Sequence, residues 1–150
     1  MRVEELPRTG HTGKEEQWEQ ALRQLYIHFQ EYSKAAMKKF DGEDIHRARV
    51  NCRKLLTLLA ILDPSHSSGL YPLLKKAQKL LGKVRDADVL IESFKERKTQ
   101  SKEAGDPSST ELLKAVIKHQ KEKRKKYREQ LAEKLPGLLG KRLDEQWENF

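Results

Sequence analysis

The sequence is poor in cysteine, in aromatic side chains and in long apolar runs. Its single cysteine, Cys52, cannot form an intramolecular disulfide, and it has no second cysteine or nearby His pair at zinc-ligand spacing. No stretch approaches the roughly 18 unbroken apolar residues that a transmembrane helix needs. Residues 1–14 lack the apolar core of a secretory signal. We therefore expect a cytoplasmic protein with no membrane span, no structural metal and no cofactor.

Motifs of catalysis and nucleotide binding are also missing. The chain contains no P-loop, no glycine-rich phosphate turn, no HExxH zinc pair and no nucleophile elbow. Cys52 falls on an apolar helical stripe, where a buried structural thiol is more frequent than a nucleophile. The sequence therefore predicts a non-enzymatic protein without catalytic residues.

Positive charge is abundant and unevenly distributed. The formal net charge is +8, and residues 46–85 hold nine Lys and Arg against one acidic residue. Residues 114–128 hold eight against one, whereas the remaining three segments are each net acidic. Segregated charge of this kind favours a surface for an anionic partner over general solubility.

Apolar residues recur at steps of three and four along most of the chain, a pattern that predicts amphipathic helices. We expect helices over residues 14–40, from 43 to just before Pro64, from 70 to about 98, and from about 110 to 135. Residues 99–109 are expected to form a flexible connection, with Ser109 or Thr110 as the cap of the fourth helix. Pro136-Gly137 is expected to interrupt that helix, and residues 138–150 to form a short final one, with Trp147 packing back.

No strand pattern of useful length is present, so the predicted fold class is all-α. Long helices joined by short connections are typical of an antiparallel four-helix bundle, in which each apolar stripe is buried against the others. We expect a flexible N-terminus over residues 1–13 and one helical domain over residues 14–150.

The second predicted helix carries a basic row. His46, Arg49 and Arg53 stand at i, i+3 and i+7, so they share one face over two turns. Arginine suits phosphate because its planar guanidinium presents a fork of donors to the phosphate oxygens. Successive phosphates of an extended anion could meet successive turns of such a row. The alternative interpretation is an ordinary solvated helix face.

The third predicted helix repeats the pattern with Lys76, Lys79 and Lys83, and Arg85 follows on another flank. Asp88 falls within the apolar stripe, and a buried carboxylate needs a partner, so we expect it to orient an arginine from a neighbouring helix. A metal site here is disfavoured, because Asp86 and Asp88 alone supply too few ligands.

The fourth predicted helix has a charge inside its apolar row. Arg124 interrupts that row and Arg128 stands at its edge. Both could point into the same groove as the basic rows of the preceding helices, or both could snorkel at a bundle end. The other lysines of residues 121–126 spread around the helix, as expected of a solvated face.

Two separate motifs resemble the CHAD family, the histidine-bearing α-helical domain. They are IHRARV at residues 45–50, continued by Arg53-Lys54-Leu55, and LGKVRDADVL at residues 81–90. The resemblance implies a helical bundle with a basic groove that binds inorganic polyphosphate, in a family that often accompanies triphosphate-tunnel enzymes. The phosphate-binding residues that it implies are His46, Arg49, Arg53, Lys54, Lys76, Lys79, Lys83, Arg85, Arg124 and Arg128.

The chain departs from the family pattern in two ways. Leu56 stands where many relatives have a further basic residue, and the length allows one helical bundle where the family typically has two. A homodimer could supply the missing half, because a two-fold interface places the same patch of each subunit side by side.

Several functional expectations follow. The partners that we expect are inorganic polyphosphate, a second copy of the chain, and a polyphosphate-metabolising or triphosphate-tunnel enzyme, with polyphosphate granules as a candidate location. The alternatives are an RNA- or DNA-binding helical protein and an adaptor whose charge steers a protein partner.

Overall fold

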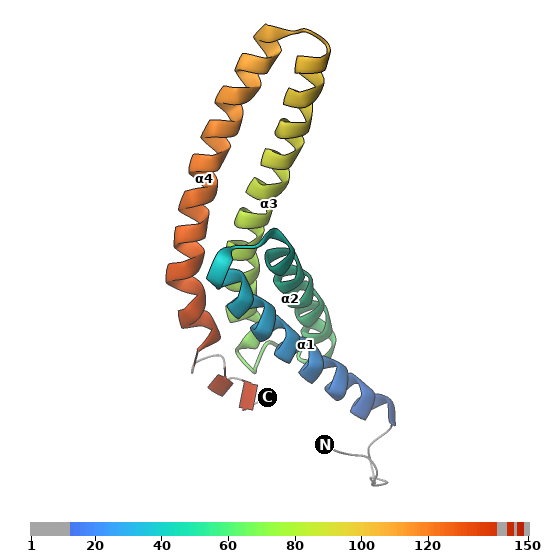
Figure 1. The fold of residues 1–150 in the computed structure, drawn as a ribbon. Helices are drawn as coiled ribbons and strands as arrows, with labels where there is room; N and C mark the ends of the chain where they lie inside the picture. Colours follow the sequence, from blue (N-terminus) through green and yellow to red (C-terminus); the bar gives the residue numbers. More distant parts are fainter. Residues whose placement is uncertain (1–12, 141–143, 146, 149–150) are drawn as a thin grey trace.

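The computed structural model describes residues 13–140, 144–145 and 147–148, and this part of the chain is built from four long helices (Figure 1). They are α1 (Gly13–Lys39), α2 (Gly42–Leu62), α3 (Leu70–Glu103) and α4 (Pro107–Leu139). The predicted all-α bundle is confirmed. Residues 1–12 of the expected flexible N-terminus lie outside the described residues. Within the described part, no helix is both long and apolar enough to cross a membrane.

The first two connections are tight and capped by acidic side chains. Asp41 accepts hydrogen bonds from the backbone N–H groups of Glu43 and Asp44, which begins α2. Beyond α2, the Asp63 carboxylate accepts from the backbone N–H and hydroxyl groups of both Ser67 and Ser68. These hydrogen bonds fix the conformation of the loop that leads into α3. The connections from α1 to α2 and from α2 to α3 are therefore both well defined.

The expected flexible connection over residues 99–109 is wrong. Helix α3 continues to Glu103, and α4 begins at Pro107. Gly105 has a φ of 68°, a left-handed conformation that ends α3, and Asp106 caps α4 by accepting from the N–H of Ser109. Pro107 in the first turn needs no N–H partner there. The glycine, aspartate and proline that resemble a loop therefore form a compact turn.

The expected interruption at Pro136 is also wrong, because α4 runs through it to Leu139. Leu135 and Leu139 are both buried on the core side, and their burial outweighs the backbone hydrogen bond that proline removes from the last turn. Beyond Gly140, Asp144, Glu145, Trp147 and Glu148 are helical, and the rest of the expected final helix lies outside the described residues.

The C-terminal segment packs back on α1, as the sequence predicted for Trp147. The indole stacks on the Tyr26 ring with the ring centres 4.1 Å apart, and the Tyr26 hydroxyl donates to Asp144 at 2.7 Å. Burial, together with this hydrogen bond, raises the pKa of Tyr26 above its ordinary value.

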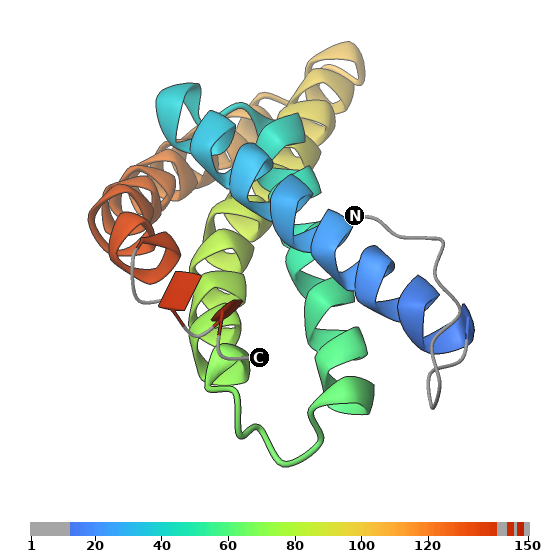
Figure 2. The same cartoon turned by 90° about the horizontal axis from the view of Figure 1, so that it is seen from below.

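Helix α3 is the centre of the fold. It packs on α2 on one side and on α4 on the other, while α1 packs mainly on α2 and touches α4 only slightly. Figure 2 shows α3 between α2 and α4, with α1 crossing the same end of the molecule. The buried stripe of α2, namely Ile45, Ala48, Cys52, Leu55 and Leu59, is the stripe that its periodicity predicted.

The α3–α4 hairpin extends well past the end of the α1–α2 pair (Figure 1). The turn between α1 and α2 reaches α3 at Asp88, because a Cβ on Gly42 would lie 3.9 Å from an Asp88 carboxylate oxygen. The remaining fifteen residues of α3, to Glu103, span about 22 Å at 1.5 Å per residue. Beyond Asp88, therefore, α1 and α2 do not cover the hairpin. We call this part the free end of the hairpin and the covered part its base.

Candidate anion-binding surface

The basic row of α2 lies against α3. The Nε atom of Arg49 is 3.6 Å from the position that a Cβ on Gly82 would take, so the guanidinium lies across the surface of α3. That Nε is buried and has no hydrogen-bond partner among the described residues. Arg53 continues the row one turn further along α2 and is exposed, while His46 precedes it and is half-buried. The row thus borders the seam between α2 and α3.

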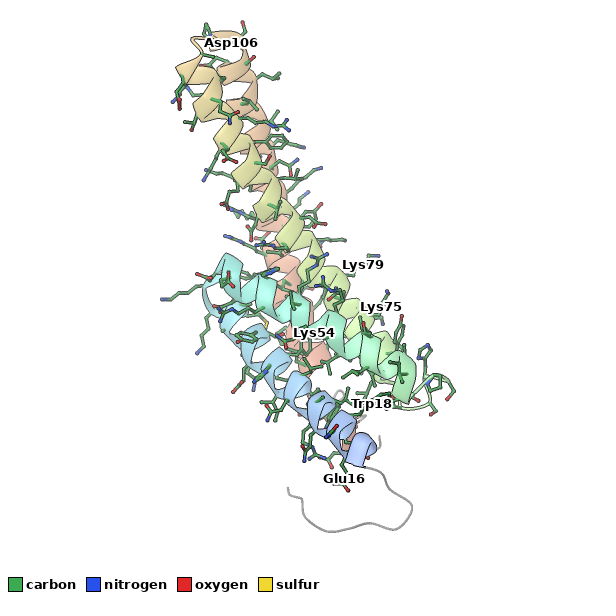
Figure 3. The ribbon with its side chains drawn as sticks, turned by 90° about the vertical axis from the view of Figure 1, so that its right-hand side faces the viewer. Glu16, Trp18, Lys54, Lys75, Lys79 and Asp106 are labelled. Atoms are coloured by element: carbon green, nitrogen blue, oxygen red, sulfur yellow. The ribbon has the colours of Figure 1, made fainter. Side chains whose placement is uncertain are left out.

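The basic row of α3 faces away from the core. Lys79 lies two positions from buried Ala77 and from buried Leu81, which places it about 200° around the helix from each. Figure 3 shows Lys75 and Lys79 standing on α3 along the edge away from α1. Lys83, further along the row, has its Nζ 5.8 Å from the centre of the Tyr127 ring of α4. At its Lys83 end, the α3 row therefore reaches α4.

Arg49 meets α3 at Gly82, which is next to Lys83 and one turn from Lys79, so we treat the two rows as one surface. We call it the outer basic face, and it consists of His46, Arg49, Arg53, Lys76, Lys79 and Lys83. None of the six forms a salt bridge with another described residue, and four of them, Arg53 and the three lysines, are exposed. The positive charge of this face is therefore not neutralised by neighbouring carboxylates, which makes it available to an external anion.

Lys54 does not join this face. It stands seven positions after Arg47, so the two share one side of α2, and Arg47 lies 5.6 Å over the ring of Tyr32 in α1. Arg47 also pairs with Glu43 at 3.1 Å. The structure thus places Lys54, which is exposed, on the α1 side of α2 and away from Arg49 and Arg53.

Arg85, Arg124 and Arg128 lie together, but in a different place from the outer basic face. With Gly42, Asp88 and Lys95 they line a pocket of about 300 Å³ where the α1–α2 turn meets α3 and α4. We call this pocket the notch. Arg124 donates to the Oδ1 atom of Asp88 at 3.3 Å, and Arg128 lies 3.7 Å from the same oxygen. The predicted orientation of an arginine by Asp88 is confirmed.

Arg128 is held from two sides. Its guanidinium lies 5.5 Å over the Phe40 ring at the end of α1 while it faces Asp88 in α3. Burial lowers the pKa of Arg128, the positive charge of Arg124 lowers it further, and Asp88 opposes both effects. Arg128 therefore stands at the boundary where the cover of α1 ends, and it shares one carboxylate oxygen of Asp88 with Arg124.

Other groups of chemical interest are structural. The Cys52 thiol is fully buried and donates to the backbone oxygen of Leu74 at 3.2 Å, and burial raises its pKa to about 12. Among the described residues, no three His, Cys, Asp or Glu side chains gather where they could hold a metal ion.

The structure adds residues that the sequence did not single out. Lys95 lines the notch, and a row of lysines from α4 with Lys98 of α3 lines a neighbouring hollow of about 430 Å³ on the hairpin. Lys114, Lys118, Lys121 and Lys125 follow one another at steps of three and four, a signal that was present in the sequence. Their closeness to Lys98 depends on how α3 and α4 pair, which the sequence alone does not show.

Comparisons with known proteins give a single result. Neither curated proteins nor solved structures contain a significant match to the chain. The family model of the CHAD domain matches residues 20–150, which includes most of α1, all of α2, α3 and α4, and both motif segments. The chain therefore belongs to the CHAD domain family.

Proposed function

We propose that the protein binds inorganic polyphosphate, without catalysis, through the outer basic face. The observation that carries this proposal is the uncompensated charge of that face: six basic side chains from α2 and α3, with no salt bridge to any described carboxylate. Membership of the CHAD family supports the choice of polyphosphate among polyanions.

The geometry suits a linear anion. Each row spans eight residues, or about 10 Å along its helix, and the two helices run antiparallel and in contact. Arginines on the α2 side can form forked hydrogen bonds with phosphate oxygens, while lysines on α3 act as point charges. An extended chain of phosphates lying over α3 would meet donors from both helices.

Nucleic acid is the second candidate and has less support. Single-stranded RNA and DNA are usually held by aromatic side chains on which bases stack, in addition to charge. Tyr127 is the aromatic residue found beside the outer basic face, and its ring already lies under Lys83. An adaptor for a polyphosphate- or triphosphate-processing enzyme is compatible with the main proposal, because the bound chain would then be delivered to that enzyme.

The salt dependence of binding tests the role of charge. Long-chain polyphosphate should bind with an affinity that falls steeply between about 50 and 200 mM salt, because each neutralised phosphate releases counterions. Arg49→Gln with Arg53→Gln should reduce the slope of log Kd against log salt by about one for each contact removed. Arg47→Gln with Lys54→Gln removes the same charge from the α1 side of the same helix and should leave the slope nearly unchanged. Equal slopes in the two double variants would exclude the outer basic face as the binding surface.

We also propose that two copies associate. Val89, Leu90 and Leu112 are large apolar residues that are more than 40% exposed on the hairpin that α1 and α2 do not cover. Apolar side chains exposed on an element without cover would be removed from water where two copies meet. Light scattering at micromolar concentration should give the mass of a dimer, and a monomer at that concentration would contradict the association.

A further inference from the structure

The side chains that line the notch carry more positive than negative charge. Four cationic side chains line it, Arg85, Lys95, Arg124 and Arg128, against the two carboxylates of Asp88 and Glu92. Both α4 arginines are directed at one oxygen of Asp88, at 3.3 and 3.7 Å. The pocket therefore has an excess of positive charge, and its two closest cations share a single acceptor.

Two buried polar atoms of the notch also lack a hydrogen-bond partner among the described residues. They are the second carboxylate oxygen of Asp88, Oδ2, and the Nε of Arg128. A buried polar atom without a partner destabilises the folded protein, so such an atom calls for an explanation. One of these atoms is an acceptor and the other a donor. A ligand that satisfies both must accept hydrogen bonds from guanidinium groups and donate one to a carboxylate.

We propose that the notch binds a single phosphoryl group that carries a proton. Its charged oxygens accept from Arg124 and Arg128, and its P–OH donates to Oδ2 of Asp88. Two sources have this chemistry, the terminal group of a linear polyphosphate and free orthophosphate. This inference rests on the proposed function in taking phosphate as the ligand, but the site is separate from the outer basic face.

Asp88 is what makes the site selective. A carboxylate repels an oxyanion that has no proton, whereas it accepts a hydrogen bond from one that has. A terminal phosphoryl group titrates near neutral pH, with a second pKa of about 6 for phosphate monoesters. Sulfate and the interior groups of a phosphate chain have no such proton to give. The notch should therefore distinguish phosphate from sulfate, and chain ends from chain interiors.

Calorimetric titration of the full chain at about pH 6 tests this. Orthophosphate should bind at least about tenfold more tightly than sulfate, and linear tripolyphosphate more tightly than cyclic trimetaphosphate, which has no chain end. If tripolyphosphate binds more tightly than orthophosphate and displaces it, the ligand is a chain end; the opposite order identifies free phosphate. Equal binding of orthophosphate and sulfate by the unmodified protein would overturn the proposal, and this comparison needs no variant.

Asp88→Asn should remove the discrimination, so that sulfate binds as well as orthophosphate, whereas Asp86→Asn, which neutralises an exposed carboxylate two residues away, should preserve it. Discrimination that survives in Asp88→Asn, in a protein whose circular dichroism melting shows it to be folded, would contradict the role of Asp88.

The Arg49→Gln, Arg53→Gln protein separates the two sites, because it should lose long-chain binding and keep the preference for orthophosphate over sulfate. Failure of long-chain polyphosphate to bind the unmodified protein would refute the proposed function and leave the orthophosphate result to decide the notch.

Discussion

The base of the α3–α4 hairpin and its free end have the same three- and four-residue periodicity but different surroundings. In the base, α1 and α2 cover the inner face of α3, and Leu74, Leu81 and Val84 are fully buried there. Past the α1–α2 turn, Ile91 and Ile117 are still buried between α3 and α4. Beside this seam, Lys95, Lys98 and Arg124 line open hollows. The comparison teaches that α3 and α4 alone bury only a narrow apolar seam, and that the covering helices extend this seam into a broader core.

The reactivity of Cys52 should show the largest difference between the two regions. Burial raises the pKa of this thiol to about 12 from its ordinary value of 9.0, so near pH 8 the thiolate fraction is lower by about a thousandfold. Alkylation by iodoacetamide in the folded protein should be at least about 100-fold slower than in denaturant. A cysteine introduced at exposed Ala104 of the hairpin tip, in a Cys52→Ala background, should react at nearly the denatured rate. Similar alkylation rates for the two cysteines in the folded protein would contradict the difference between the two regions.

Large-to-small substitutions should cost more free energy of unfolding in the base than in the free end of the hairpin. Leu81→Ala removes a fully buried side chain of the base and should lower the free energy of unfolding by about 2–5 kcal/mol. Leu112→Ala removes a side chain of the hairpin that is 66% exposed, and its effect should stay within about 0.5 kcal/mol. Urea denaturation followed by circular dichroism measures both. A large cost for Leu112→Ala would indicate that the hairpin is covered in solution, which would favour the dimer.

Acid should weaken the base through Asp63 by a smaller amount. Hydrogen bonds from the Ser68 hydroxyl, and then from other groups of Ser67 and Ser68, hold the pKa of Asp63 below its ordinary value. A carboxyl with a lowered folded pKa contributes stability above its unfolded pKa of about 3.9 and loses it as the pH falls through the folded value. The melting temperature of Asp63→Asn should therefore fall less between pH 5 and pH 3 than that of the unmodified protein. The exposed control Glu133→Gln should follow the unmodified protein.

Much of the fold was predictable because helical periodicity is a local signal. The buried stripe of α2 and the burial of Cys52 follow directly from residues three and four apart. The helix ends were less predictable. Pro136 resembles a helix breaker, yet burial of Leu139 one turn later keeps α4 intact.

The sequence predicted the basic rows of the candidate site, but not the positions of these rows relative to the other helices. The spacing of Arg49 and Arg53 and of Lys79 and Lys83 shows which side chains share a face of one helix. Which face meets which neighbour depends on packing between distant segments. The contact of Arg47 with Tyr32, which locates Lys54 on the α1 side, is an example. Likewise, the separation of Arg124 and Arg128 from the outer basic face depends on where the α1–α2 pair ends.

The most direct test of the polyphosphate proposal is a competition assay at moderate salt. Long-chain polyphosphate of defined length, single-stranded RNA and duplex DNA, matched in total charge, compete for the unmodified protein and for the Arg49→Gln, Arg53→Gln and Arg47→Gln, Lys54→Gln double variants. The outer basic face predicts that polyphosphate displaces both nucleic acids, and that affinity falls at least about tenfold in the first variant but little in the second. Equal competition by RNA or DNA, or equal losses in the two variants, would contradict it and identify the protein as a general binder of polyanions.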